Sequence, residues 1–149
     1  MGVKRFLLGF CVAASAAAGL WYFRTPTAEE RLAANERAAA ARGSVVYHTT
    51  LLDKHMIFEA ESCRVYLLDN SGKQVQRTKV VRAGFYFFLD GCMEQSFSRE
   101  GEYLYVYLAN RAIGAGGGNT SGGNYRTRDG LTWEKHMDRG WEAVETAQM

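Results

Sequence analysis

The chain has 149 residues, with 18 lysines and arginines, 16 aspartates and glutamates, and a formal net charge of +2. This length allows one modest domain. From Ser44 onward there are 12 basic and 13 acidic residues, so the main part of the chain carries a net charge of −1. A nearly neutral domain without a basic stripe is not built to neutralise phosphates, which argues against nucleic-acid binding.

The N-terminus has the pattern of an export signal or a membrane anchor. Lys4 and Arg5 precede an uncharged run over residues 6–23, close to the length that a bilayer-spanning helix needs. We predict a transmembrane signal-anchor over residues 1–24, with the N-terminus in the cytoplasm. The alternative is a cleaved signal peptide, with a cleavage site after Ala18. Both predict that the rest of the chain lies outside the cytoplasm, and the anchor would hold it at the inner membrane.

A short helix is predicted next, within a segment over residues 25–43. Thr27 and Glu30 have the spacing of a capping box, and Gly43 is a suitable stop. The apolar residues between them are alanines, apart from Leu32, so such a helix has little to bury by itself. We therefore expect a solvated stalk between membrane and domain. The alternative is a weak packing surface for a neighbouring helix of a larger assembly.

Residues 44–149 are predicted to form a mainly β domain, a small antiparallel sandwich or barrel. Short runs rich in β-branched and aromatic residues alternate with turn formers. The runs cover 45–52, 63–68, 75–81, 84–89 and 102–108. Residues 70–72 are expected at the tip of a hairpin and 90–91 in a turn, and the lysine and arginine of residues 75–82 indicate an edge strand.

Cys63 and Cys92 are the cysteines of this domain, and in an oxidising compartment we expect a disulfide between them. The alternative is two buried free thiols. Neither cysteine has a histidine or another cysteine at the short spacing of a metal site. His48 and His55 would point to opposite faces of a continuous strand, and sharing a metal ion would need a turn between them. We therefore predict no metal ion and no cofactor.

The glycine-rich segment 114–124 lacks the lysine and the following helix of a phosphate-binding loop, so no nucleotide binding is predicted. We expect a flexible loop. The alternative is a loop that becomes ordered against a partner, since functional contacts often lie on long loops. Gly116, Asn119 and Asn124 are then candidate contact residues.

Residues 127–133 carry a short motif, with Thr127, Asp129, Gly130, Thr132 and Trp133 at fixed spacing. It resembles the shorter variant of the Asp-box, a hairpin motif repeated in sialidase-like propellers and other β proteins. The resemblance implies that the aspartate and threonine hydrogen-bond the turn and that the tryptophan packs beneath it. It covers about seven residues in one copy, so it implies a hairpin and no glycosidase activity.

Tyr103, Tyr105 and Tyr107 alternate along one predicted strand and so share one of its faces. They either pack in the core or form a contact surface for a protein or a glycan, because tyrosine combines a large apolar area with a polar tip. We include them among the candidate partner-binding residues.

These features predict a cellular location and candidate interaction surfaces, and they predict no catalytic residue. The expected function is a non-enzymatic subunit or adaptor of an envelope assembly, acting in the periplasm or on the extracellular side and binding other envelope proteins. One alternative is an inhibitor, immunity or exclusion factor at the same location. Another is a cell-wall glycan-binding or hydrolytic protein.

Overall fold

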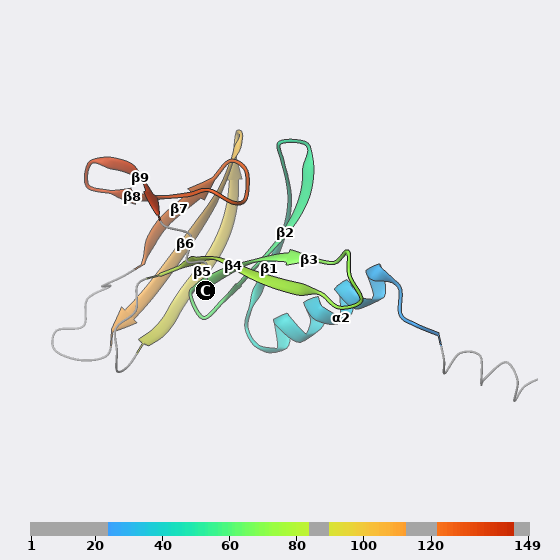
Figure 1. The fold of residues 1–149 in the computed structure, drawn as a ribbon. Helices are drawn as coiled ribbons and strands as arrows, with labels where there is room; N and C mark the ends of the chain where they lie inside the picture. The colour runs from blue at the N-terminus through green and yellow to red at the C-terminus, as the bar shows by residue number, and fades with distance from the viewer. Residues whose placement is uncertain (1–23, 84–89, 113–121, 145–149) are drawn as a thin grey trace, which may run out of the picture.

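The computed structural model describes residues 24–83, 90–112 and 122–144, which form one helix and two antiparallel sheets (Figure 1). The helix is α2 (Ala28–Ala41). Sheet A contains, in spatial order, β1 (Val45–Leu51), β2 (Lys54–Glu61), β3 (Arg64–Asp69) and β4 (Gln76–Arg82). Sheet B contains β5 (Asp90–Glu100), β6 (Tyr103–Ala112), β7 (Gly123–Thr127), β8 (Trp133–Met137) and β9 (Gly140–Val144).

The prediction of a mainly β, antiparallel domain is confirmed, but neither sheet closes on itself among the described residues, which contradicts the barrel alternative. Four predicted runs correspond to β1, β3, β4 and β6, and β4 is an edge strand as expected. The run over 84–89 lies outside the described residues. The predicted turn at Asp90 and Gly91 is instead the start of β5.

The two sheets share one apolar core. Alternation along β6 directs Leu104, Val106 and Leu108 inward, where all three are fully buried. Phe58 of sheet A meets fully buried Trp133 of sheet B edge to face, with 5.9 Å between ring centroids. Such aromatic pairs contribute beyond their buried area. The core therefore fixes which face of each sheet remains outside.

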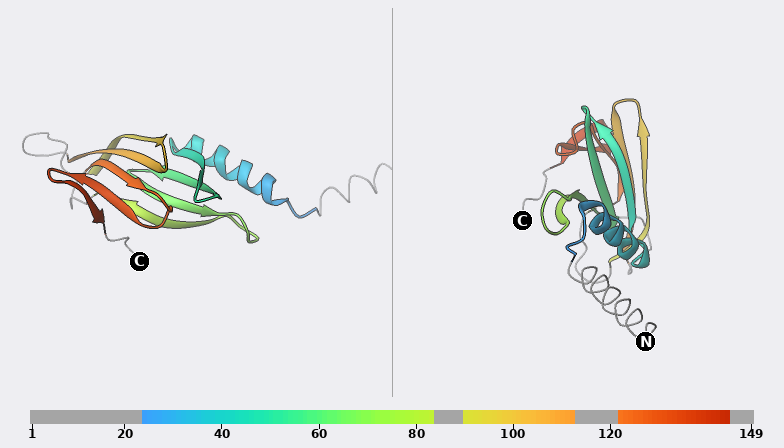
Figure 2. Two further views of the ribbon diagram at one scale, coloured as in Figure 1. Left: turned by 90° about the horizontal axis from the view of Figure 1, so that it is seen from above. Right: turned by 90° about the vertical axis from the view of Figure 1, so that its right-hand side faces the viewer.

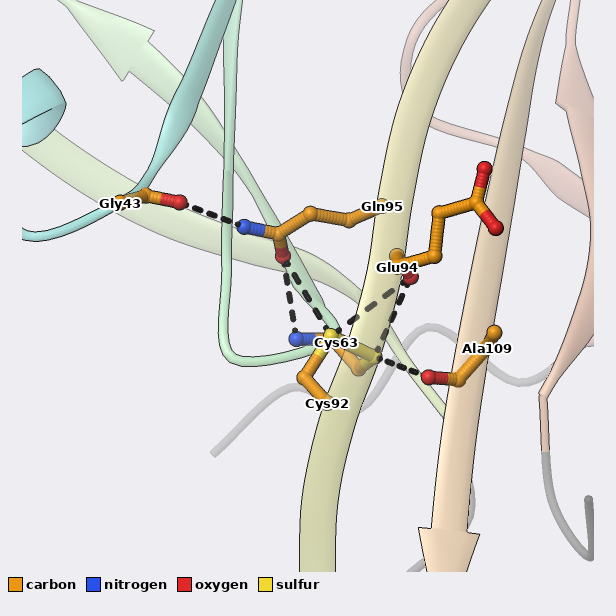
Figure 3. The surroundings of a disulfide bond; sticks show 6 residues. All are labelled: Gly43, Cys63, Cys92, Glu94, Gln95 and Ala109. Carbon is orange, nitrogen blue, oxygen red and sulfur yellow. Dashed lines mark hydrogen bonds between the residues drawn. A yellow bond between two sulfur atoms is a disulfide. The ribbon is translucent and has the colours of Figure 1, made fainter.

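The disulfide between Cys63 and Cys92 is confirmed, with 5.3 Å between the Cα atoms. It joins the β2–β3 turn to β5 and so cross-links the two sheets (Figure 3). Gln95 reinforces this junction, because its Oε1 accepts from Cys63 N at 3.2 Å and its Nε2 donates to the carbonyl of Gly43 at 3.1 Å. The end of the helical segment and both sheets therefore meet at one point.

Helix α2 begins with the expected capping box, in which Thr27 N donates to Glu30 Oε2 at 2.7 Å and Glu30 N donates to Thr27 Oγ1 at 3.2 Å. Among the described residues no helix is long and apolar enough to cross a bilayer. Residues 6–23, where the membrane segment is predicted, lie outside the described residues.

The helix does not stand away from the domain as the predicted stalk would. It lies beside sheet A (Figures 1 and 2). Arg31 Nη2 donates to the carbonyl of Gly72 at 2.8 Å, and Asn70 Nδ2 donates to the carbonyl of Ala28 at 2.7 Å. Ala39 is its one buried residue. The contacts are therefore mainly polar, which is why the apolar pattern of the helix did not predict them.

The β1–β2 turn contains an unusual leucine. Leu52 and Asp53 have φ of +46° and +62°, as a two-residue turn of type I′ requires, although asparagine and glycine are the residues that favour it. The left-handed region costs other residues about 1–2 kcal/mol. The Leu52 side chain is 62% exposed, so little burial offsets this strain.

Leu52→Asn should raise the free energy of unfolding by about 1 kcal/mol, because asparagine tolerates this conformation better than leucine. Urea denaturation followed by tryptophan fluorescence measures the change. Leu131→Asn is the matched control: Leu131 is 59% exposed in a turn but has no positive φ, so less than about 0.5 kcal/mol is expected. Lower stability of Leu52→Asn would contradict the assignment of strain to Leu52.

Candidate interaction surface

The tyrosine stripe lies on the outer face of sheet B. Tyr103, Tyr105 and Tyr107 alternate with the core leucines and valine of β6 and are half-buried. The register places Tyr105 opposite Arg126 and Tyr107 opposite Asn124, and the Asn124 side chain is exposed. Partners in an antiparallel register point to the same side. Three predicted tyrosines and one predicted asparagine therefore share this face.

Four further residues complete the surface, which we call the sheet B patch. It consists of Tyr103, Tyr105, Tyr107, Asn124, Arg126, Glu134, His136 and Trp141. The last four were not predicted as contact residues. Alternation away from buried Trp133 along β8 assigns Glu134 and His136 to the outer face, and this signal was available in the sequence.

Arg126 is the centre of the sheet B patch. Its guanidinium carbon lies 4.5 Å from the ring centroid of Tyr103 and 4.2 Å from that of Trp141. Its Nε donates to Glu134 Oε2 at 2.6 Å. Desolvation lowers the pKa of Arg126, but hydrogen bonds to Glu134 and Tyr105, together with charge interactions with Glu134 and Tyr103, raise it above its ordinary value. The cation is therefore permanent and held rigidly between two aromatic rings.

Trp141 extends the aromatic cluster onto the edge strand β9. Its ring meets Tyr105 edge to face at 5.7 Å and His136 at 5.0 Å, both between ring centroids. Trp141 is half-buried, whereas His136 is exposed. Tyrosine, tryptophan and arginine are the side chains enriched at the energetically important points of protein interfaces. The sheet B patch combines all three in one contiguous cluster.

The motif that resembles an Asp-box forms the β7–β8 turn beside this patch. Asp129 Oδ1 accepts from the backbone N of Leu131 and Thr132 at 2.8 and 2.7 Å. Thr127 Oγ1 accepts from Gly130 N at 2.9 Å and donates to the carbonyl of Thr132 at 2.7 Å. Partial burial raises the pKa of Asp129, but these backbone bonds and the threonine hydroxyls lower it below its ordinary value of 3.8.

These bonds hold the turn next to the patch, and Trp133 lies beneath it, donating from Nε1 to the carbonyl of Gly130 at 3.3 Å. A hollow of about 190 Å³ separates the turn from Tyr103 and Arg126. Ligand pockets usually measure roughly 300–1,000 Å³. The hollow is therefore of a size to accept one side chain of a partner.

The other predicted candidates do not add to this surface. Gly116 and Asn119 lie outside the described residues. His48 and His55 would lie on opposite faces of a continuous strand, but a turn at residues 52–53 puts them on one face of sheet A, with 5.4 Å between ring centroids. His48 Nε2 lies 2.8 Å from Glu36 Oε1. Within the described part of the chain, no three histidine, cysteine or carboxylate side chains are arranged to hold a metal ion.

The outer face of sheet A carries an ion-pair network that holds the end of the helical segment. Glu59, fully buried, lies 3.0 Å from Arg42 Nη2 and 3.0 Å from Arg77 Nε, the latter close but not aligned for a hydrogen bond. Glu61 bridges the same two arginines at 2.7 Å each. Arg77 also lies over the ring of Tyr66, 4.1 Å from its centroid. We assign this network to structure, because it joins Arg42 to two strands.

Acid should weaken the network at Glu61. Hydrogen bonds from Arg77 and Arg42 hold the pKa of Glu61 below its ordinary value of 4.5. A lowered folded-state pKa contributes stability above the unfolded pKa, and this contribution is lost as pH falls through the folded value. Glu61→Gln should therefore be less stable than the wild type at about pH 7, and the difference should shrink at about pH 3. Urea unfolding at both pH values tests this, and a constant difference would contradict it.

Comparisons of the chain with protein-family models, with curated proteins and with solved structures find no match.

Proposed function

We propose that this chain is an extracytoplasmic protein-binding module, a subunit or adaptor of an envelope assembly that holds a partner protein on the sheet B patch. The observation that carries the proposal is Arg126, fixed between Tyr103 and Trp141 on the outer face of a sheet. Rigid aromatic and arginine side chains bind with little loss of side-chain entropy. The proposal includes no catalytic step.

The location outside the cytoplasm has two supports. Residues 6–23 have the composition of a membrane anchor or an export signal. The disulfide between Cys63 and Cys92 belongs to a type that forms and persists in oxidising compartments. We propose an inner-membrane protein with its β domain in the periplasm or on the extracellular side.

A protein fits the patch better than a sugar. Glycan sites use open aromatic faces, whereas the Arg126 guanidinium already covers one face of the Tyr103 ring and one of the Trp141 ring. Ring edges, hydroxyl groups and the exposed side chain of Asn124 remain to face a partner. This mixture of apolar area and hydrogen-bonding groups is typical of protein interfaces.

Co-purification of the full chain from membranes after mild detergent extraction tests the proposal. A partner should be recovered in fixed ratio with the wild type, and Trp141→Ser should reduce its affinity roughly 30-fold, as expected for an interface residue worth about 2 kcal/mol. Leu131→Ser, which changes an exposed leucine outside the patch, should leave recovery unchanged. Unfolding curves verify that both variants are folded. Equal recovery with Trp141→Ser would contradict the proposal.

A further inference from the structure

Strand β5 adds a column of polar side chains to the patch. The register pairs Glu94 with Ala109, Ser96 with Tyr107, Ser98 with Tyr105 and Glu100 with Tyr103. These four β5 residues therefore lie on the same face as the tyrosines, and all are exposed. Figure 3 shows the change of side along the strand, with Gln95 directed toward Gly43 and Glu94 directed away from it.

Two described arginines of this face pair with carboxylates. Arg126 bonds to Glu134, and Arg128 lies 2.6 Å from Glu102 at the edge of the patch. Glu94 and Glu100 have no ion-pair partner among the described residues. Two exposed carboxylates, one at each end of the β5 column, are therefore open to a cation of a partner.

We infer that the sheet B patch binds a cationic segment, a lysine- or arginine-bearing strand or loop of another protein. This inference rests on the proposed function and names the chemistry of its partner. A long basic side chain packs its stem on a tyrosine ring and pairs its charged head with a carboxylate. Arg126, enclosed by Tyr103, Trp141 and Glu134, is an internal example of the same arrangement.

Charge also favours a cationic segment over other classes of partner. An acidic protein surface, a nucleic acid or an anionic lipid would bring like charge toward Glu94 and Glu100, and like charges across an interface oppose binding. A second copy of the chain placed face to face would add its own two carboxylates to the same interface. A basic segment is the occupant that complements both the carboxylates and the tyrosines.

The test places a photo-crosslinking benzophenone amino acid at Tyr107 of the full chain, in cells that express it. Mass spectrometry identifies the cross-linked segment, which should carry lysine or arginine and belong to another protein. Glu94→Lys and Glu100→Lys should each reduce the yield roughly tenfold. Glu29→Lys, an equal charge change at an exposed position of α2, should not reduce it.

The outcomes separate the two proposals. Absence of any cross-link from position 107 would overturn both. Three results would overturn the inference of a cationic partner. They are a cross-link to an acidic or uncharged segment, a cross-link to a second copy of this chain, and a yield that neither Glu94→Lys nor Glu100→Lys changes. The first and the third of these results would leave the proposed function standing if the cross-linked segment belongs to another protein. A cross-link to a second copy of this chain would not.

Discussion

Glu59→Gln should lower the free energy of unfolding by about 3 kcal/mol, because it breaks an ion-pair network at its fully buried carboxylate and leaves the two arginines with less compensation. Glu59 is fully buried between Arg42 and Arg77. Glu61 continues to pair both arginines, so the loss should lie at the lower end of the usual range of about 3–5 kcal/mol. Urea denaturation of the purified chain measures it.

Glu102→Gln is the matched control for this substitution. It removes the same charge from an arginine pair at 2.6 Å, but the Glu102 and Arg128 side chains are 67% and 54% exposed. Solvent screening reduces the value of such a pair to less than about 1 kcal/mol. Equal losses for the two variants would show that burial of Glu59 does not determine its contribution.

The second large effect is expected from the disulfide. The free energy of unfolding of the double variant Cys63→Ser and Cys92→Ser should be lower by about 3–4 kcal/mol. This is the chain-entropy value for a cross-link that spans 29 positions. The loss should be large in this fold because the bond joins the two sheets at the turn between β2 and β3.

Thermal unfolding with and without a reducing agent measures this contribution. The wild type with reducing agent should unfold at the same temperature as the double variant without it. The reducing agent should not change the unfolding temperature of the variant. A double variant as stable as the oxidised wild type would contradict the assigned role of the bond.

The strands whose pattern is local could be predicted from the sequence. The run that contains Leu104, Val106 and Leu108 predicted a strand but not which of its faces is buried. Asp129 and Gly130 occupy a turn that their residue types favour. The disulfide followed from cysteine number and predicted compartment. In each case the determining signal lies within a few residues or in a simple count.

Strands β2 and β5 were missed for a physical reason. β2 carries Glu59 and Glu61 on its outer face, where Arg42 and Arg77 neutralise their charges. These arginines are far from the glutamates in the sequence, so no local pattern indicates the pairing. The outer face of β5 is polar and exposed, so its residues resemble a loop. The docking of α2 was missed likewise, because its contacts are hydrogen bonds to Asn70 and Gly72.

The sheet B patch was predicted only in part. The tyrosines are adjacent in one strand, whereas Arg126 and Trp141 join them through the register of β6 to β9. That register depends on the hydrogen bonds of the Asp129 turn and on the β8–β9 pairing. Periodicity predicts which face a residue occupies, but it does not predict which strands lie beside each other.

The most direct test of the central claim compares photo-cross-linking from two faces of the same chain. A benzophenone amino acid at Tyr107 reports on the sheet B patch, and one at Lys73 reports on the exposed β3–β4 turn of sheet A. We predict a specific cross-linked partner protein from position 107 and none from position 73. A partner that cross-links only from position 73, or equally from both positions, would contradict the assignment of the outer face of sheet B as the binding surface.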